Sequence, residues 1–226
     1  MAKIVFSAVV GDARGKTGGT VFTKGRHGAF IRRKVSPIQP RTSTQSGVRS
    51  NFTKLSKAWS GTSMTDDLRA AWNALAALYP QNDVFGASHV LTGLQMFMKL
   101  NRALSNFDMG PIYTPPATLD AGAPGSLSVT ATAPSTLTIT PTVNPLGSEG
   151  TEIFAAAQQS PGRTFVGSRY RLIGATLTAP PWNFGAQYTA KFGNLIPLKK
   201  VPIKVVYMTQ ATGAQGTPTR ALQVVS

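Results

Sequence analysis

The sequence has no cysteine, only two histidines, and eight acidic residues among its 226 positions. Without cysteine there can be no disulfide framework, no thiolate zinc site and no cysteine nucleophile. The two histidines, His27 and His89, are too few for a multi-histidine metal site or a histidine-based proton relay. We therefore expect no metal site, no cofactor and no small-molecule substrate.

Long hydrophobic runs are also missing. No run reaches the roughly 18 apolar residues that a membrane-spanning helix needs, and Met1 to Val10 is too short and too alternating for a secretory signal. We expect a protein with no membrane partner, one that stays in the cytoplasm or leaves it by assembly or lysis.

Positive charge is abundant and unevenly placed. The formal net charge is +15, and 12 of the 23 basic residues but only one acidic residue lie within residues 1–60. Such a one-sided segment predicts an anionic partner. The predicted partner-binding residues are Arg14, Lys16, Lys24, Arg26, Arg32, Arg33, Lys34, Arg41 and Arg49.

Two kinds of anionic partner fit this segment. Nucleic acid is one, because Phe22 and Phe30 could stack on bases while arginines pair with phosphates. An acidic protein surface is the other, and we favour it because the extended residues Ser36 to Pro40 resemble an arm that wraps a neighbouring subunit. We expect residues 1–60 to order fully only in the assembly.

The first 110 residues read as strands followed by helices. Ile4 to Val10 alternates with a period of two, and Thr20–Lys24 and Ala29–Val35 flank a Gly25–Gly28 loop that suits a β-hairpin. Three amphipathic helices are predicted next. Their apolar positions are Val48, Phe52, Leu55 and Trp59 in the first; Leu68, Trp72, Leu75 and Tyr79 in the second; and a broader set between Thr92 and Asn106 in the third.

The third helix carries too many apolar residues for one face, so it is either central to the core or covered by a partner chain. A Pro-rich segment, residues 111–116, then ends the helical sequence. From residue 117, short alternating runs predict an immunoglobulin-like or fibronectin-like β-sandwich, with the fibronectin-like variant preferred because no Cys–Trp–Cys spacing exists. The predicted fold class is therefore α+β, with domains 1–110 and 117–226 and a linker at 111–116.

Residues 11–17 are the most tempting catalytic motif, because they combine glycines with Lys16 and Thr17 after an apolar strand. A phosphate loop needs four residues between its glycines and a helix after it, whereas here there are three residues and a strand-like sequence. Glu149 and Glu152 lie in what reads as a Gly/Ser-rich loop and do not form a convincing catalytic pair. Trp182, in a Pro-Pro-Trp run, is expected to be partly exposed.

Four motifs follow one another in the first 105 residues. They are Arg14-Gly15-Lys16-x-Gly18-Gly19-x-Val21-Phe22, Gly28-x-Phe30-x-Arg32, Pro37-x-x-Pro40-x-Thr42-x-x-Gln45-x-x-x-Arg49-x-x-Phe52, and Trp59 with Arg69-x-Ala71-Trp72. This order resembles a poorly characterised family of short proteins from tailed-phage and prophage structural gene clusters. The Ser60–Thr65 connection is longer than the tight turn of that pattern.

The resemblance implies a virion or virion-assembly role, often with a fibronectin-like or immunoglobulin-like domain following, and it brings no catalytic residues. We therefore expect a non-enzymatic virion protein, present in the host cytoplasm during assembly, that decorates the capsid or belongs to the neck or tail. It would dock in multiple copies on acidic surfaces of other virion subunits. The alternative is a nucleic-acid-binding protein that contacts packaged DNA through the same basic segment.

Overall fold

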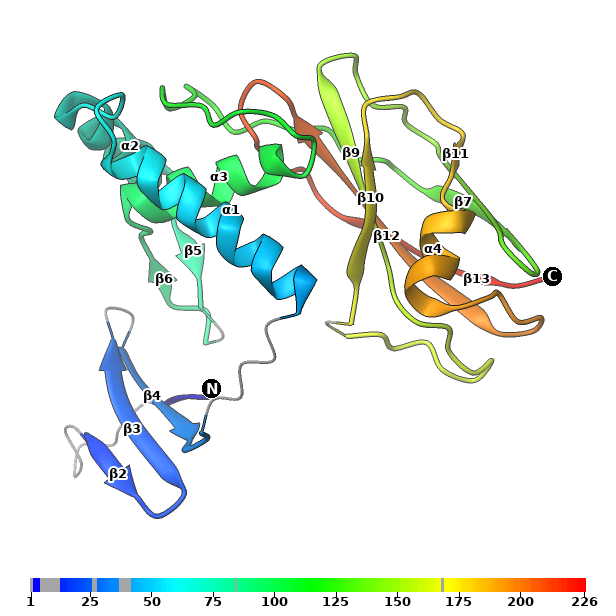
Figure 1. Ribbon diagram of the computed structural model, residues 1–226, viewed down its shortest axis with the longest axis horizontal. Coiled ribbons are helices and arrows are strands. Elements are labelled where there is room, and N and C mark those ends of the chain that lie inside the picture. The colour runs from blue at the N-terminus through cyan, green and yellow to red at the C-terminus, as the bar shows by residue number, and fades with distance from the viewer. Residues whose placement is uncertain (1, 5–12, 26–27, 37–41, 84, 168) are drawn as a thin grey trace.

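The computed structural model describes residues 2–4, 13–25, 28–36, 42–83, 85–167 and 169–226, and it has the mixed α+β fold that the sequence predicts. Three regions follow one another along the chain: a small N-terminal sheet, a group of three helices, and a C-terminal region built from two sheets (Figure 1). The N-terminal sheet projects from the helices as a separate lobe.

The N-terminal sheet is antiparallel with strand order β1-β4-β3-β2. Its strands are β1 (Ala2–Ile4), β2 (Gly15–Thr17), β3 (Thr20–Gly25) and β4 (Gly28–Arg33). The predicted hairpin is confirmed, because β3 and β4 pair from Thr20↔Arg33 to Gly25↔Gly28, and Gly28 has the positive φ of 107° that glycine tolerates. Most of the predicted first strand and of the predicted arm lies outside the described residues.

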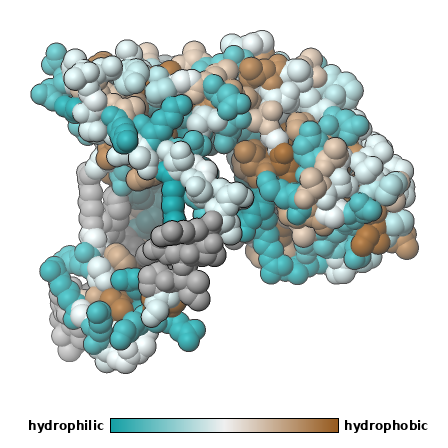
Figure 2. All heavy atoms as spheres, viewed as in Figure 1, coloured by the Kyte–Doolittle hydropathy of each residue, from teal (hydrophilic) through white to brown (hydrophobic). Residues whose placement is uncertain are grey.

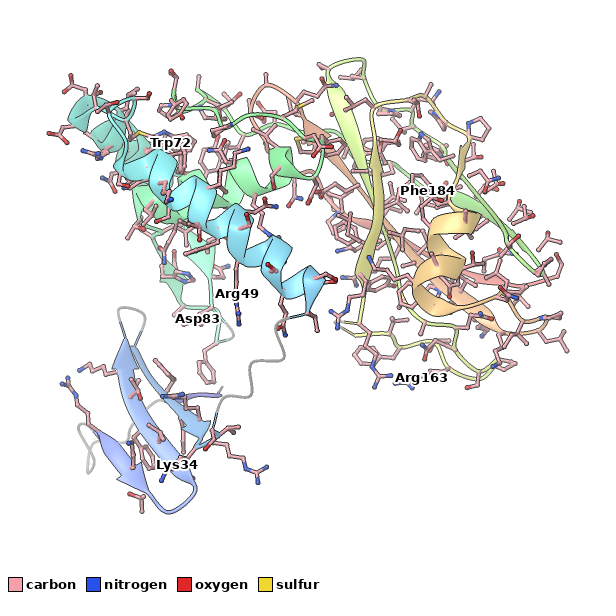
Figure 3. All side chains as sticks on the ribbon, viewed as in Figure 1. Lys34, Arg49, Trp72, Asp83, Arg163 and Phe184 are labelled. Atoms are coloured by element: carbon pink, nitrogen blue, oxygen red, sulfur yellow. The ribbon has the colours of Figure 1, made fainter. Side chains whose placement is uncertain are left out.

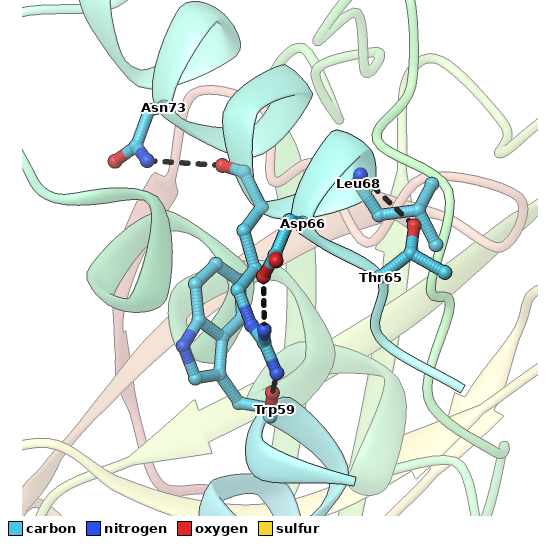
Figure 4. Close-up of polar contacts among 6 residues, drawn as sticks. Trp59, Thr65, Asp66, Leu68 and Asn73 are labelled. Carbon is cyan, nitrogen blue, oxygen red and sulfur yellow. Dashed lines mark hydrogen bonds and ion pairs between the residues drawn. The ribbon is translucent and has the colours of Figure 1, made fainter. Parts of the chain in front are cut away.

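The three predicted helices are confirmed as α1 (Ser43–Ser60), α2 (Asp66–Leu78) and α3 (Gly93–Ser105). A threonine hydroxyl precedes each helix and accepts a hydrogen bond from the third helical backbone N–H, which satisfies a donor that the helix leaves unpaired. The Ser60–Thr65 connection is tied down by Arg69, which contacts Asp66 at 2.6 Å and donates to the Trp59 carbonyl at 3.2 Å (Figure 4). A short β-hairpin, β5 (Gln81–Asn82) with β6 (Ser88–His89), separates α2 from α3.

The helical core is centred on α3. Of the two explanations for its many apolar residues, a central place in the core or cover by a partner chain, the structure supports the first. Phe97 and Trp72 are both fully buried and meet edge to face with ring centroids 5.4 Å apart. The prediction that Val48 and Phe52 join this core is wrong, because they are 57% and 61% exposed. On the α3 side of the groove beside them, Met98 is the one apolar lining residue and Arg102, Ser105 and Asn106 are polar, so the first half of α1 has little apolar surface to pack against.

Two antiparallel sheets share the core of the C-terminal region. Their strand orders are β11-β8-β7 and β10-β9-β12-β13. The strands are β7 (Leu127–Thr132), β8 (Thr136–Pro141), β9 (Glu149–Ala155), β10 (Arg171–Thr176), β11 (Trp182–Asn183), β12 (Lys200–Thr209) and β13 (Thr219–Val224). The short alternating runs predicted after residue 117 correspond to strands of these sheets, and their inward residues fill the space between the sheets.

Two expectations fail in this region, and one helix was not predicted. Trp182 is only 3% exposed, since it belongs to the shared core and donates its indole N–H to the Thr178 carbonyl at 2.9 Å. Glu149 and Glu152 lie on β9 rather than in a loop. A helix that the sequence reading missed, α4 (Gly185–Phe192), covers the core through the fully buried Tyr188.

The predicted linker at residues 111–116 is held against the helices. Asn101 accepts from the Ile112 N–H at 2.7 Å, and Trp72 donates to the Tyr113 carbonyl at 2.7 Å. Beyond the linker, Ala103 and Leu104 of α3 pack on Met208 of β12. The domain boundary remains a prediction, but the helices and the C-terminal sheets share an apolar contact.

Candidate partner-binding surface

The strand register distributes the basic residues of the N-terminal sheet over both of its faces. Lys16, Val21 and Arg32 occupy one cross-strand row and therefore share a face. Thr20 pairs with Arg33 in the next row, which places Arg33 on the opposite face, and Lys24 lies on that same face opposite Ala29. The sheet therefore presents cations in two directions.

The remaining predicted site residues do not all join these rows. Arg14 and Lys34 are exposed beside the strands, and Arg49 is exposed on α1, where it extends on the side that faces the sheet lobe (Figure 3). Arg26 and Arg41 lie outside the described residues. Within the described part of the chain, Lys16, Arg32, Arg33 and Lys34 form no ion pair.

The N-terminal sheet buries little of its own surface. Of its described side chains only Val21 is buried, while Phe22, Phe30 and Ile31 remain partly exposed. In the described residues the strands pack on one another and make no extensive contact with a helix or with the C-terminal sheets. Figure 2 shows the result as a lobe in which hydrophilic and hydrophobic atoms both face solvent.

Both edges of this sheet end on short strands. β1 and β2 pair on one side each, so the outer backbone groups of both strands lack a neighbouring strand in the described residues. Exposed edges, apolar side chains and cations on both faces are three features that a second molecule could satisfy together. They make this sheet the candidate partner-binding surface.

The sequence pattern around Gly15 does not build a nucleotide site. Gly15–Thr17 forms β2, and the residues that follow form a strand, so no helix N-terminus is available to bind a phosphate. His89 lies on the short strand β6 and is partly buried, whereas His27 lies outside the described residues. No group of three or more His, Asp or Glu side chains within the described ranges could hold a metal ion.

The junction between α3 and the C-terminal sheets contains a buried carboxylate that sequence reasoning missed. Glu152 is 0% exposed and accepts hydrogen bonds from the Asn106 amide and the Gln215 amide, each at 2.5 Å. Burial raises the pKa of Glu152, while the two amides and the charges of Arg102 and Lys204 act in the opposite direction. These groups come from β9, from β12 and the segment after it, and from the end of α3, so no local signal could have revealed them.

A cavity of about 760 Å³ opens in the C-terminal region. Glu149 lines it, but both of its carboxylate oxygens already accept backbone N–H groups, from Gly122 at 2.6 Å and from Leu146 at 2.9 Å. Tyr207 lines it too and donates to the Val143 carbonyl at 2.6 Å. These polar groups hold loops together and leave no nucleophile paired with a base.

Comparisons with protein-family models, with curated proteins and with solved structures found no match for this chain. Within the residues that the structure describes, no helix is long and apolar enough to span a membrane.

Proposed function

We propose that this chain is a non-enzymatic structural protein of a phage virion, a capsid-decorating, neck or tail component that docks through its basic N-terminal sheet. The observation that carries the proposal is the two-faced distribution of cations on a sheet with open edges and little core. The virion context comes from the motif order in residues 1–105. The partners would be acidic surfaces of other virion subunits, in a multi-copy assembly.

The geometry favours a protein partner over a nucleic acid. A duplex lies against one face of a protein and gathers the phosphate-binding residues there. Arg32 and Arg33 point to opposite faces, so a duplex that lies flat against one face of the sheet contacts only one of the two side chains. An acidic subunit that surrounds the sheet, or pairs with one of its edges, can contact both arginines.

The C-terminal region would be the displayed part, and we assign it to the fibronectin-like variant of the β-sandwich. The first, second and fifth strands form one sheet, and the third, fourth, sixth and seventh form the other. In the immunoglobulin constant arrangement the fourth strand belongs to the sheet of the first two. Here β10 pairs with β9 instead, which supports the fibronectin-like assignment.

Nucleic acid binding remains the second candidate because of the side chains on one face of the sheet. Phe30 shares the face of Lys16 and Arg32, and an aromatic ring beside two cations can stack a base while phosphates are neutralised. Affinity for single-stranded or duplex DNA that falls steeply between about 50 and 200 mM salt would favour this candidate. Weak binding with a shallow salt dependence would favour the protein partner.

The proposal is tested in particles produced with altered chains. Deleting residues 1–43 removes the sheet and should abolish incorporation of the chain into particles.

Reversing Arg32→Glu with Arg33→Glu should lower the copy number of the chain in particles at least about tenfold, because two charges at the interface change sign. The matched control, Arg163→Glu with Arg169→Glu, reverses two exposed cations of the C-terminal region and should incorporate normally. Normal copy number for the deleted chain would contradict the docking assignment.

A further inference from the structure

The first half of α1 exposes two apolar side chains. They lie on the same stripe of the helix as residues of its second half that pack in the core. Leu55 is buried and Trp59 packs on Phe97, with ring centroids 5.4 Å apart. One and two turns earlier on the same stripe, Phe52 is 61% exposed and Val48 is 57% exposed. The apolar stripe of α1 therefore continues beyond the core and ends in solvent.

These side chains line a groove between α1 and α3. Its volume is about 150 Å³, and Leu55 and Met98 line it together with Val48 and Phe52. Arg102, Ser105 and Asn106 of α3 and Asn51 of α1 complete the lining. The groove thus has apolar side chains contributed by both helices and a cation at its α3 side.

Charge identifies the kind of segment that this groove suits. Arg49, Lys54 and Lys57 on α1, and Lys99 and Arg102 on α3, are the ionisable side chains of the two helices, and neither helix has an acid. Arg102 lines the groove, and Arg49 lies one turn before Phe52 on the adjoining side of α1. An occupant with acidic side chains beside an apolar stripe would neutralise the rim while covering the apolar side chains.

We propose that the α1/α3 groove is a second docking site, which binds an amphipathic acidic helix of a partner subunit. That the partner is another virion subunit rests on the proposed function. The chemistry of the groove does not depend on it. Val48 and Phe52 lie four residues apart, and Met98 faces them from α3, so a helix with apolar residues at i, i+4 and i+7 can meet all three. Acidic residues flanking that stripe would reach Arg102 on one side and Arg49 on the other.

The experiment uses the full chain and a fluorescein-labelled synthetic helix of about 18 residues, which spans about five turns. The probe has leucines at i, i+4, i+7 and i+11 and glutamates beside them, and a second probe replaces each glutamate with lysine. Anisotropy should show saturable binding of the acidic probe and none of the basic probe.

Matched variants locate the binding. Val48→Ser with Phe52→Ser should weaken it at least about tenfold, because two apolar anchors are lost. Leu78→Ser is the control, since Leu78 is 71% exposed on α2, away from the groove. Arg102→Glu should weaken binding, while Lys57→Glu, on the far side of α1 from the stripe, should change it little.

Circular dichroism of each variant checks that the helices remain folded. We expect them to remain folded in the Val48 and Phe52 variant, because both side chains are exposed. Equal affinity in the groove variants and in Leu78→Ser would overturn the proposal, since binding would then reflect net charge alone. Binding of the basic probe, or no saturable binding of the acidic probe, would overturn it as well. The particle experiment with residues 1–43 deleted tests docking through the N-terminal sheet and leaves the groove in place. The anisotropy experiment tests the groove alone, so failure of one proposal is distinguishable from failure of the other.

Discussion

The N-terminal sheet and the C-terminal sheets are both antiparallel and are predicted by the same alternation of apolar and polar residues, yet they bury very different amounts of surface. The C-terminal strands enclose a cluster of 16 buried residues shared by two sheets and α4. The described side chains of the N-terminal sheet include one buried residue, Val21. Strand pairing alone therefore does not make a core.

The difference shows which region shields its own apolar side chains without a partner. The C-terminal sheets cover each other, so their inward side chains are fully shielded. The N-terminal sheet has no second layer among the described residues, and its cations lie on both faces. A second layer supplied by a partner would complete it, which is the physical basis of the docking assignment.

The largest expected effect separates the two regions by stability. Ile203→Ala removes a fully buried side chain between the C-terminal sheets and should lower the free energy of unfolding by about 2–5 kcal/mol. Phe22→Ala removes a partly exposed ring from the N-terminal sheet and should lower it by less than about 1 kcal/mol. Urea unfolding followed by far-UV circular dichroism measures both, because it reports on the strands of both regions, and equal losses would break the comparison.

The next effect tests the junction between the helices and the C-terminal sheets. Because the pKa of Glu152 in the folded chain is raised above 4.5, the native state holds this proton more tightly than the unfolded state does. Stability from this group is therefore lost as the pH rises from 4.5 through the raised value. Glu152→Gln removes the ionisation, so the variant should gain stability relative to the parent chain over that interval.

Chemical unfolding of both chains at a series of pH values between about 4 and 8 measures this difference. A constant difference would mean that the pKa of Glu152 is the same in the folded and unfolded chains. An Asn106→Ala chain serves as a second comparison, because it removes one of the two amide donors while the carboxylate remains.

The smallest effect concerns the loop that Tyr207 holds. Tyr207→Phe removes the hydrogen bond to the Val143 carbonyl and should cost about 1 kcal/mol at neutral pH. Burial, with a smaller contribution from Glu149, raises the pKa of Tyr207 to about 12. The parent chain therefore loses stability as the pH rises from 10 towards 12, and the penalty of the substitution should shrink there. A penalty that grows with pH would contradict this.

Local patterns predicted most of the elements because each pattern reports a local property. The β3–β4 hairpin follows from alternation around Gly25 and Gly28, and the helices α1 and α2 follow from the helical spacing of their apolar residues. The α4 helix was missed because it has eight residues, with a glycine at its start and no side-chain cap. The shared apolar contact of α3 with Met208 depends on residues far apart in the sequence.

The candidate site was predicted in part for the same reason. Composition identified the basic segment, but the placement of Arg32 and Arg33 on opposite faces required the strand pairing. The exposure of Val48 and Phe52 depends on the mostly polar residues with which α3 lines the groove beside them, and helical periodicity in α1 cannot report those residues.

Hydrogen exchange on the isolated full chain tests most directly whether the N-terminal sheet lacks a stable core of its own. We expect amides of β3 and β4 to exchange at least about a hundredfold faster than amides of β9 and β12, because exchange rates follow the free energy of local opening. Protection of β3 and β4 equal to that of β9 and β12 would contradict it, since the sheet would then be stable without a partner.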